Sequence, residues 1–315
     1  MRRLLVALAL AGCVPHIAED PSVVVAERIL AVRATPAEVA PGGTVSLVAL
    51  DADTHGPIDA PALDWAECLA RLPLSEPGPF ARACVLGDPT ALDMPQTGAA
   101  ATFTISSDAC RLFGPDPPPA SAGQSTGRPV DPDSTGGYTQ PIRVALADGT
   151  IAFAPVRLHC GVAGATQAQA AELTRRYHPN THPALTELTA IHADGSFEPI
   201  VDGVPLHVTA SETITMHAAW ADCPDETPCD GAEHYAMFDR ASASVVSARE
   251  AIRISWVGTI GRWDEPRSGR TTDDPAVTTD GTWYAPDTSE RGTLFVVLRD
   301  DREGVSWTVI NVIVD

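Results

Sequence analysis

The chain has 315 residues, which allows two domains of ordinary size, and 44% of its residues are hydrophobic, which is enough for packed cores. Aromatic residues make up only 5%, and 28 prolines and 24 glycines interrupt the sequence, a mix that favours short strands joined by turns. The formal net charge of -20 repels polyanions, which excludes DNA or RNA as a partner.

The N-terminus has the layout of a secretory signal. Arg2 and Arg3 precede an apolar run over residues 4–11, far shorter than the ~20 residues of a membrane-spanning helix. The run ends in Leu10-Ala11-Gly12-Cys13, which resembles the lipobox of bacterial lipoproteins. The resemblance implies cleavage before Cys13, a lipid such as palmitate on Cys13, and a place at the outer membrane, on its periplasmic face or at the cell surface. An ordinary signal peptide with a chance cysteine is the alternative.

Short alternating segments predict strands in the N-terminal half of the chain. Residues 30–36 predict an edge strand, and residues 44–50 place Val45, Leu47 and Ala49 on one face. Further strands are predicted at residues 63–68, 102–105, 142–147 and 151–160. The last two form a hairpin, because Asp148-Gly149 between them supplies a tight turn.

A stretch rich in Pro, Gly, Ser and Asp spans residues 114–137 and holds almost no apolar side chains. Such a stretch cannot bury enough surface to order itself, so we expect a disordered loop with Cys110 at its base. It is either a plain insertion or a recognition loop.

The best helix candidate is residues 166–177, with Thr166 as its N-cap. His178 and His182 follow four residues apart, but a proline after each prevents them from sharing a helix face. A solvated linker is therefore preferred to a metal site, and we place the junction between the two domains here.

The C-terminal half alternates more regularly. Thr213–Trp220 places its even-numbered side chains inward, and Ile252, Ile254 and Trp256 repeat the pattern. Residues 294–298 and 308–314 predict a closing hairpin across residues 300–304.

Four segments of this half resemble bacterial immunoglobulin-like modules of the PKD type. The segments are Ile254-Ser255-Trp256, Gly261-Arg262-Trp263-Asp264, Thr282-Trp283-Tyr284-Ala285-Pro286-Asp287 and residues 294–304. The resemblance covers residues 204–315, and the first domain resembles the family less. It implies a β-sandwich with a non-catalytic role at the surface or in the periplasm, and no catalytic residues.

Six cysteines remain besides Cys13, and an even number in an exported chain predicts disulfides. The pairs that are closest in sequence are Cys68–Cys84, Cys110–Cys160 and Cys223–Cys229. None of these cysteines forms a CxxC motif, which disfavours a zinc ribbon or a redox site.

Candidate chemistry is sparse. Metalloprotease, nucleophile-elbow and nucleotide-binding motifs do not occur in the sequence. Asp300, Asp301 and Glu303 are weak calcium ligands, since the interleaved arginines favour ion pairs instead. The six tryptophans could form a sugar-binding surface or part of the hydrophobic core. Most occupy inward strand positions, which favours the core, and the side-chain direction is least clear for Trp263 and Trp307.

We therefore expect a mainly β protein with two immunoglobulin-like β-sandwiches, long loops and one short linker helix. Its segments are a signal peptide, a lipidated spacer, a first sandwich, a linker and a second sandwich, at residues 1–12, 13–26, 27–162, 163–183 and 184–315. The spacer spans at most ~45 Å, which places the first domain close to the membrane.

The expected function is that of a lipid-anchored cell-envelope protein, with a non-catalytic binding or structural role and a protein or polysaccharide partner. Neither a cofactor nor a metal is required, calcium being the weak exception. The alternatives are an envelope enzyme with its site in the long loops and an accessory subunit of an outer-membrane complex.

Overall fold

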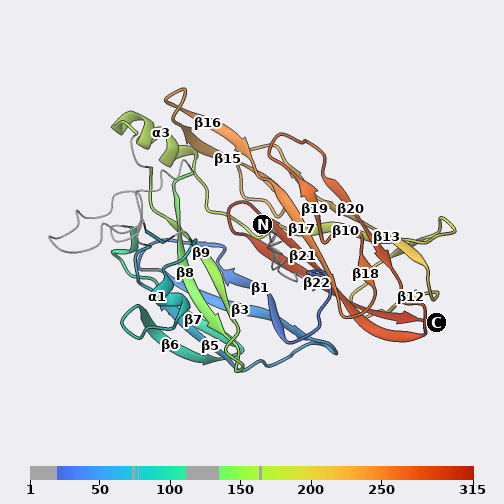
Figure 1. Cartoon of the computed structure of the whole chain (residues 1–315). Helices are drawn as coiled ribbons and strands as arrows, with labels where there is room; N and C mark the ends of the chain where they lie inside the picture. The colour runs from blue at the N-terminus through green and yellow to red at the C-terminus, as the bar shows by residue number, and fades with distance from the viewer. Residues whose placement is uncertain (1–19, 73–74, 77, 111–134, 163–164) are drawn as a thin grey trace, which may run out of the picture.

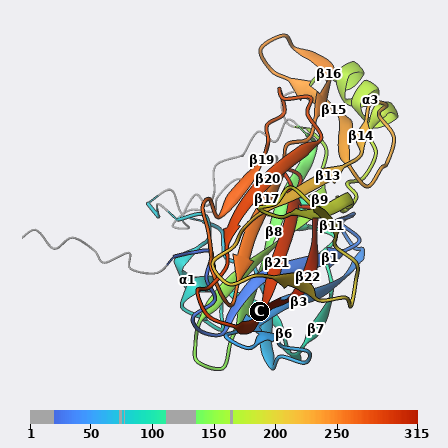
Figure 2. The same ribbon diagram turned by 90° about the vertical axis from the view of Figure 1, so that its right-hand side faces the viewer.

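The computed structural model describes residues 20–72, 75–76, 78–110, 135–162 and 165–315 (Figure 1). The chain is mainly β and folds into two β-sandwiches that pack against each other (Figure 2). Most of the predicted disordered loop, residues 114–134, lies outside the described residues.

The first sandwich is built from two antiparallel layers. One sheet has β3 at its centre, with β1 on one side and β4 and β7 on the other. The other sheet runs in the order β2-β9-β8-β5-β6, with only β2 parallel to its neighbour. The strands are β1 (Arg28–Thr35), β2 (Glu38–Val39), β3 (Thr44–Asp53), β4 (Gly56–Pro57), β5 (Leu63–Cys68), β6 (Leu92–Gly98), β7 (Ala100–Thr104), β8 (Gly137–Ala145) and β9 (Ile151–His159).

The core of the first sandwich follows the predicted alternation. Val45 and Leu47 of β3 are fully buried and face Trp65, whose indole Nε1 donates a hydrogen bond to the carbonyl of Gly98 at 2.8 Å. The predicted edge strand is β1, and the hairpin β8–β9 turns at Asp148, whose carboxylate accepts the Thr150 amide at 2.8 Å. Local turn chemistry and burial therefore agree in this domain.

Helix α3 (Gln167–Arg176) connects the sandwiches, and its N-cap is Thr166 as predicted. The Thr166 hydroxyl accepts the Gln169 amide, and the Gln169 side chain reaches back to the Thr166 amide, which makes a capping box. The helix ends at Tyr177, which is extended and leads into His178-Pro179. Among the described helices, α3 and α1 (Arg82–Val85), none is long and apolar enough to cross a membrane.

The second sandwich has two layers, and each of them has five strands. Their orders are β11-β10-β13-β20-β18 and β12-β22-β21-β17-β19, and a small sheet β14-β15-β16 extends from one end. The strands are β10 (Leu185–Ile191), β11 (Phe197–Pro199), β12 (Leu206–Val208), β13 (Thr213–Trp220), β14 (Asp222–Cys223), β15 (Ala232–Asp239), β16 (Ser244–Arg249), β17 (Ile252–Gly258), β18 (Arg262–Trp263), β19 (Arg267–Arg270), β20 (Thr278–Tyr284), β21 (Glu290–Asp300) and β22 (Val305–Val314).

Tryptophans fill the core of the second sandwich. Trp220, Trp256, Trp263 and Trp283 are all buried, and Trp256 stacks on Trp263 with 5.0 Å between ring centroids. A side chain at Gly281 would place its Cβ 2.6 Å from the Trp256 ring, so only glycine fits beside this indole. The alternation predicted for β13 and β17 is confirmed, and Trp263 belongs to the core.

Three disulfides join the described cysteines. They are Cys68–Cys84, Cys110–Cys160 and Cys223–Cys229, with Cα–Cα distances of 5.7, 5.3 and 6.2 Å. These are the same sequence-local pairs that the spacing of the cysteines favours.

Candidate functional site

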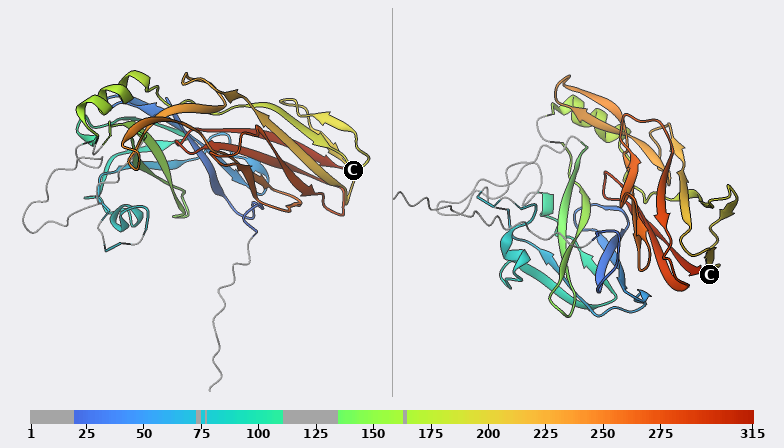
Figure 3. Two further views of the ribbon diagram at one scale, coloured as in Figure 1. Left: turned by 90° about the horizontal axis from the view of Figure 1, so that it is seen from above. Right: turned by 45° about the vertical axis from the view of Figure 1, so that its right-hand side comes forward.

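The most unusual polar site lies where the two sandwiches meet, a region that we call the junction. Figure 3 shows the sandwiches side by side along this boundary. One part of the junction is apolar. Leu50 and Ala52 of β3 face the second sandwich, whereas Val45 and Leu47 of the same strand face the first core. The apolar part comprises Val24, Ala31, Leu50, Ala52, Val257, Phe295, Val297 and Val305, with Trp307 at its edge.

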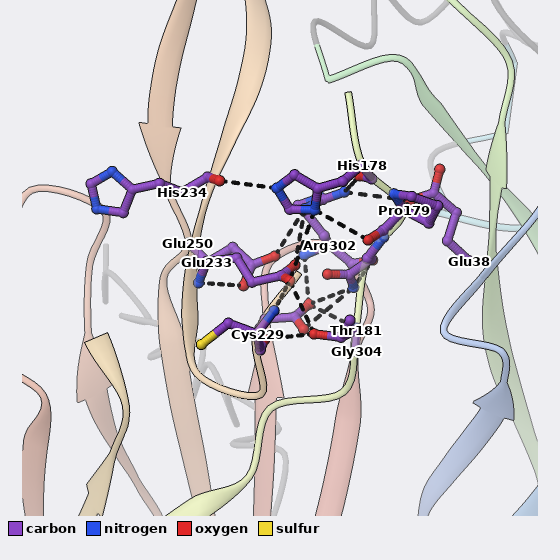
Figure 4. A network of polar contacts seen from close by, with 12 residues as sticks. Glu38, His178, Pro179, Thr181, Cys229, Glu233, His234, Glu250, Arg302 and Gly304 are labelled. Carbon is purple, nitrogen blue, oxygen red and sulfur yellow. Dashed lines mark hydrogen bonds and ion pairs between the residues drawn. The ribbon is translucent and has the colours of Figure 1, made fainter. Parts of the chain in front are cut away.

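The other part of the junction is ionic and centres on Arg302, in the turn between β21 and β22 (Figure 4). Its side chain is only 1% exposed. Guanidinium Nη1 lies 3.2 Å from a carboxylate oxygen of Glu233 and 3.4 Å from one of Glu250, and Nη2 lies 3.5 Å from Glu38. The guanidinium carbon also lies 4.6 Å from the centre of the Tyr235 ring. Arg302 thus belongs to the second sandwich but binds a carboxylate of the first.

Glu38, on the short strand β2, is the contribution of the first sandwich. Its carboxylate accepts hydrogen bonds from Arg157 Nε at 3.1 Å, from the Asn180 amide at 3.0 Å and from the Tyr177 hydroxyl. Burial by itself raises the pKa of Glu38, but Arg157, Tyr177, Asn180 and Arg302 outweigh burial, so the pKa lies below its ordinary value. Glu38 is therefore an anion that the linker and both sandwiches share.

Two other carboxyl groups of the junction have raised pKa values. Burial, followed by the nearby charge of Asp300, raises the pKa of Glu250. Burial likewise raises the pKa of Asp300, although its carboxylate accepts the amides of Arg302 at 2.8 Å and Gly304 at 2.7 Å. Burial therefore makes these two carboxyl groups harder to ionise than exposed ones, although Arg302 beside Glu250 opposes the effect.

The linker residues His178 and His182 are not solvated, so that expectation is wrong. His178 is buried, and its Nε2 donates to the carbonyl of His234 at 3.0 Å. The Nδ1 atom of His182 accepts the Val305 amide at 3.0 Å, which leaves Nε2 to donate to the carbonyl of Ala34 at 2.6 Å. His182 therefore bridges β1 and β22, and burial lowers its pKa. Apolar packing of the two sandwiches closes over the linker, which spacing in the sequence does not reveal.

The loop closed by Cys223–Cys229 is tied to the same network. The Cys229 amide donates to Glu233 at 2.9 Å. The Thr181 hydroxyl lies 2.6 Å from the Cys229 carbonyl and 3.0 Å from Glu233. One disulfide-braced loop therefore helps to position the carboxylate that binds Arg302.

The three weak calcium candidates lie in the turn that carries Arg302. Asp300 points into the network, Asp301 accepts the Ala251 amide at 3.3 Å, and Glu303 is exposed at the surface of the turn with φ of 76°. Within the described part of the chain, no three His, Cys, Asp or Glu side chains are grouped to hold a metal ion. Calcium binding by these residues stays a prediction. A calcium ion would compete for the Asp300 carboxylate with the amides of Arg302 and Gly304.

Residues 20–26, the described part of the expected spacer, contact the second sandwich before the chain enters β1. The Gly258 amide donates to the Ser22 carbonyl at 2.8 Å, and the Val24 amide donates to the Gly258 carbonyl at 2.9 Å. Ser22 and Val24 are buried. This segment is thus part of the junction, which the sequence alone does not indicate.

A separate open groove of about 520 Å³ lies at the far end of the second sandwich. His192 lines it, held between Glu212 at 3.0 Å and Glu198 at 3.2 Å, and these two carboxylates raise the pKa of its imidazole. His207 lies 3.1 Å from Asp315 at the rim of the groove. Each of these histidines therefore has a carboxylate partner.

We call Arg302, Glu38 and Glu233 the clasp, because their ion pairs join the two sandwiches. Arg302, Glu38 and Glu233 are sequestered from solvent, so a dissolved substrate does not reach the ion pairs in this structure. The sequence does not decide whether Trp307 belongs to the core or to the surface. In the structure it lies partly buried at the junction, with the Arg33 guanidinium 5.1 Å from its ring centroid. The arrangement fixes one sandwich against the other.

Comparison with known proteins identifies no family: neither a family model nor a curated protein matches the chain. Solved structures of low similarity include the D0–D1 domain of intimin, at 9% identity over 90% of this chain and 98% of that one, with a TM-score of 0.22. Fibronectin(III)-like modules of Clostridium thermocellum CbhA align at 12% identity over 94% and 92%, with a TM-score of 0.21.

The Yersinia pseudotuberculosis adhesin InvE aligns at 8% identity over 91% of this chain and 58% of that one, with a TM-score of 0.21. These identities and TM-scores are too low to transfer the function of any of these proteins to this chain.

Proposed function

We propose that this protein is an exported, lipid-anchored component of the bacterial cell envelope, and that its two sandwiches act as one non-catalytic binding or structural unit. The anchor is a lipid on Cys13, and the site of action is the outer membrane. The partner is a protein or a polysaccharide of the envelope.

The observation that carries the proposal is the buried clasp. Arg302, Glu38 and Glu233 commit the most distinctive charged groups to holding the sandwiches together. Three disulfides brace the domains further, and disulfides persist in oxidising compartments outside the cytoplasm. A stiff pair of sandwiches, each braced by its own disulfides, suits a protein that presents a surface to a partner.

Lipidation is tested by replacing the cysteine of the lipobox. Cys13→Ser should move the protein from the membrane fraction to the soluble fraction of cells and abolish labelling with radioactive palmitate. Val14→Ser, which keeps the cysteine, is the matched control and should stay with the membrane. A Cys13→Ser protein that remains in the membrane fraction contradicts the anchor.

The binding role is tested with the anchored protein in intact cells. Chemical crosslinking followed by affinity capture should recover a defined envelope protein or polysaccharide that is missing from the Cys13→Ser cells. Recovery of no crosslinked species in either strain contradicts the binding role and leaves the structural one. Turnover of an envelope substrate by the purified protein would contradict a non-catalytic role.

A further inference from the structure

The chain contacts the second sandwich before it enters the first. Val23 forms a parallel bridge with Gly258, at the end of β17, and two hydrogen bonds flank this bridge. The Asp20 carboxylate accepts both the amide and the hydroxyl of Ser22, at 2.9 and 2.6 Å. The Arg28 guanidinium, at the start of β1, lies 3.3 Å from the Pro21 carbonyl. Residues 20–24 therefore lie in a fixed position on the folded protein, and we call them the docked segment.

The docked segment is fixed to both sandwiches at once. Val24 is 1% exposed and packs in the same cluster as Leu50 of the first sandwich and Phe295 of the second. The point at which the chain leaves toward Cys13 is thus the boundary between the sandwiches, and not the free end of the first one. In a linear arrangement of separate domains, by contrast, only the first domain would be near an N-terminal anchor.

The remaining reach of the anchor is short. Cys13 precedes Asp20 by seven positions, so the chain between them spans at most about 25 Å even when fully extended. A net charge of -22 after removal of Arg2 and Arg3 opposes adsorption to anionic headgroups, so proximity to a bilayer must come from the tether.

From these observations we propose that the lipid bilayer faces the boundary between the two sandwiches, and that both lie at a similar distance from the membrane. The proposal rests on the lipid anchor at Cys13 proposed above. The occupant of this face is the membrane itself, because the docked segment ends there and its lipidated residue lies only seven positions away.

The orientation can be measured by energy transfer to the membrane. The lipidated protein is placed in phosphatidylcholine vesicles that carry an acceptor lipid, with a donor amino acid introduced at Asp64 or at Asp280. Asp64 lies on β5, in the first-sandwich sheet that contributes nothing to the apolar part of the junction, and Asp280 lies on β20, in the corresponding sheet of the second sandwich. Transfer from the two sites should agree within about twofold, because each lies one sheet spacing of ~10 Å beyond the junction-facing sheet.

One-sided transfer would overturn the proposal. In that result the donor at Asp64 transfers energy to the membrane, whereas the donor at Asp280 transfers no more than it does in the Cys13→Ser protein. Mass spectrometry of the same samples separates this result from failure of the anchor. A chain without lipid on Cys13 contradicts the proposed function, whereas a lipidated chain with one-sided transfer contradicts only the orientation.

Two neighbouring valines give a matched pair of variants. Val24 is buried, whereas Val25 is 55% exposed. Val24→Asp places a carboxylate in the apolar cluster and should release the docked segment, which lengthens the tether and lowers transfer from both sites together. Val25→Asp should leave both transfers unchanged. Unchanged transfer in a folded Val24→Asp protein would contradict the role of the docked segment.

If Val24→Asp does not fold, a flexible Gly-Ser insertion between Ala18 and Glu19 gives an independent test. It leaves every described contact in place and should again lower transfer from Asp64 and Asp280 together. A fall at Asp280 alone would show that the first sandwich is held near the membrane by a contact of its own, which overturns the proposal.

Discussion

The two parts of the junction hold the same sandwiches together by different physical means. The apolar part, from Val24 to Val305, excludes water over a smooth cluster of aliphatic side chains and Phe295. Its attraction is non-directional and roughly proportional to the area buried. The ionic part depends on individual distances between Arg302 and the carboxylates of Glu38, Glu233 and Glu250. It therefore favours a single relative position of the sandwiches.

The comparison indicates a division of roles. Buried ion pairs recover little more than the cost of removing their charges from water, and in some proteins they fix a unique arrangement instead. We therefore expect the apolar part to supply most of the affinity between the sandwiches and the ionic part to fix their register. Loss of either partner of an ion pair is still costly, because it leaves an unpaired buried charge.

The largest expected effect is that of Arg302→Met. The substitution leaves Glu38 and Glu233 without their shared cation, and should lower the free energy of unfolding by about 3–5 kcal/mol. Chemical denaturation measures this change. Arg291→Met, at an exposed arginine of β21, is the control and should stay within about 0.5 kcal/mol of the wild type. Equal stability of the two variants would show that the ion pairs do not hold the junction.

The apolar part is tested by Leu50→Ala. Leu50 is buried between the sandwiches, and truncation should cost about 2–3 kcal/mol through lost burial and an incompletely filled cavity. Val48→Ala, on the same strand but 41% exposed, should cost far less. Unfolding in urea would quantify both. A Leu50→Ala cost no greater than that of Val48→Ala would assign the attraction to the ionic part instead.

The turn that carries Arg302 is tested by Gly304→Ala. A Cβ at this position would lie 1.9 Å from a carboxylate oxygen of Asp300 and 2.6 Å from the Thr181 carbonyl. The substitution should displace the turn and cost about 1–3 kcal/mol. Gly78→Ala, whose Cβ would meet its nearest neighbour at 3.5 Å, is the control for adding a methyl group. Identical melting temperatures of the two variants would contradict close packing of the turn.

The smallest expected effect is the pH dependence of the melting temperature, to which buried carboxyl groups contribute and the apolar part of the junction does not. Burial raises the pKa of Glu67 to about 7, with a further contribution from Asp93, and it also raises the pKa of Asp300 and Glu250. A carboxyl group with a raised folded-state pKa stabilises the fold fully below its unfolded pKa, and this contribution is lost as pH rises through the folded value. The melting temperature should therefore fall between pH 5 and pH 8.

Glu67→Gln should reduce this slope, because the amide stays neutral at every pH in the range. Asp53→Asn, at a half-exposed carboxylate whose pKa is lowered, is the control and should keep the slope. Glu38 acts in the opposite sense, since its lowered pKa makes its contribution disappear as pH falls through that lowered value. A melting temperature that rises from pH 5 to pH 8 in the wild type would contradict the proton retention described here.

Local sequence patterns predict the sandwiches well. Thr166 begins the helix, Asp148-Gly149 turns the hairpin, and the alternation around Trp256 gives the correct inward face. Each of these features is decided by residues within one or two turns of the chain, so a single sequence contains the information.

The junction could not be predicted in the same way. Glu38 and Arg302 are 264 positions apart, and an isolated glutamate or arginine is usually exposed. Outside the junction, a charged residue at an inward position did give a signal, since Glu67 shares a face with Leu63 and Trp65 and is buried. Leu50 and Ala52 gave no signal at all, because their outward direction has meaning only once a second sandwich covers it.

The central claim is that the ionic and apolar parts of the junction make the two sandwiches one cooperative unit. Differential scanning calorimetry of the Cys13→Ser protein with its disulfides intact tests this claim most directly. One transition with equal calorimetric and van't Hoff enthalpies is expected for the wild-type junction, and two transitions when Arg302→Met is combined with Leu50→Ala, which weakens both parts. Two resolved transitions with the junction unaltered would contradict it.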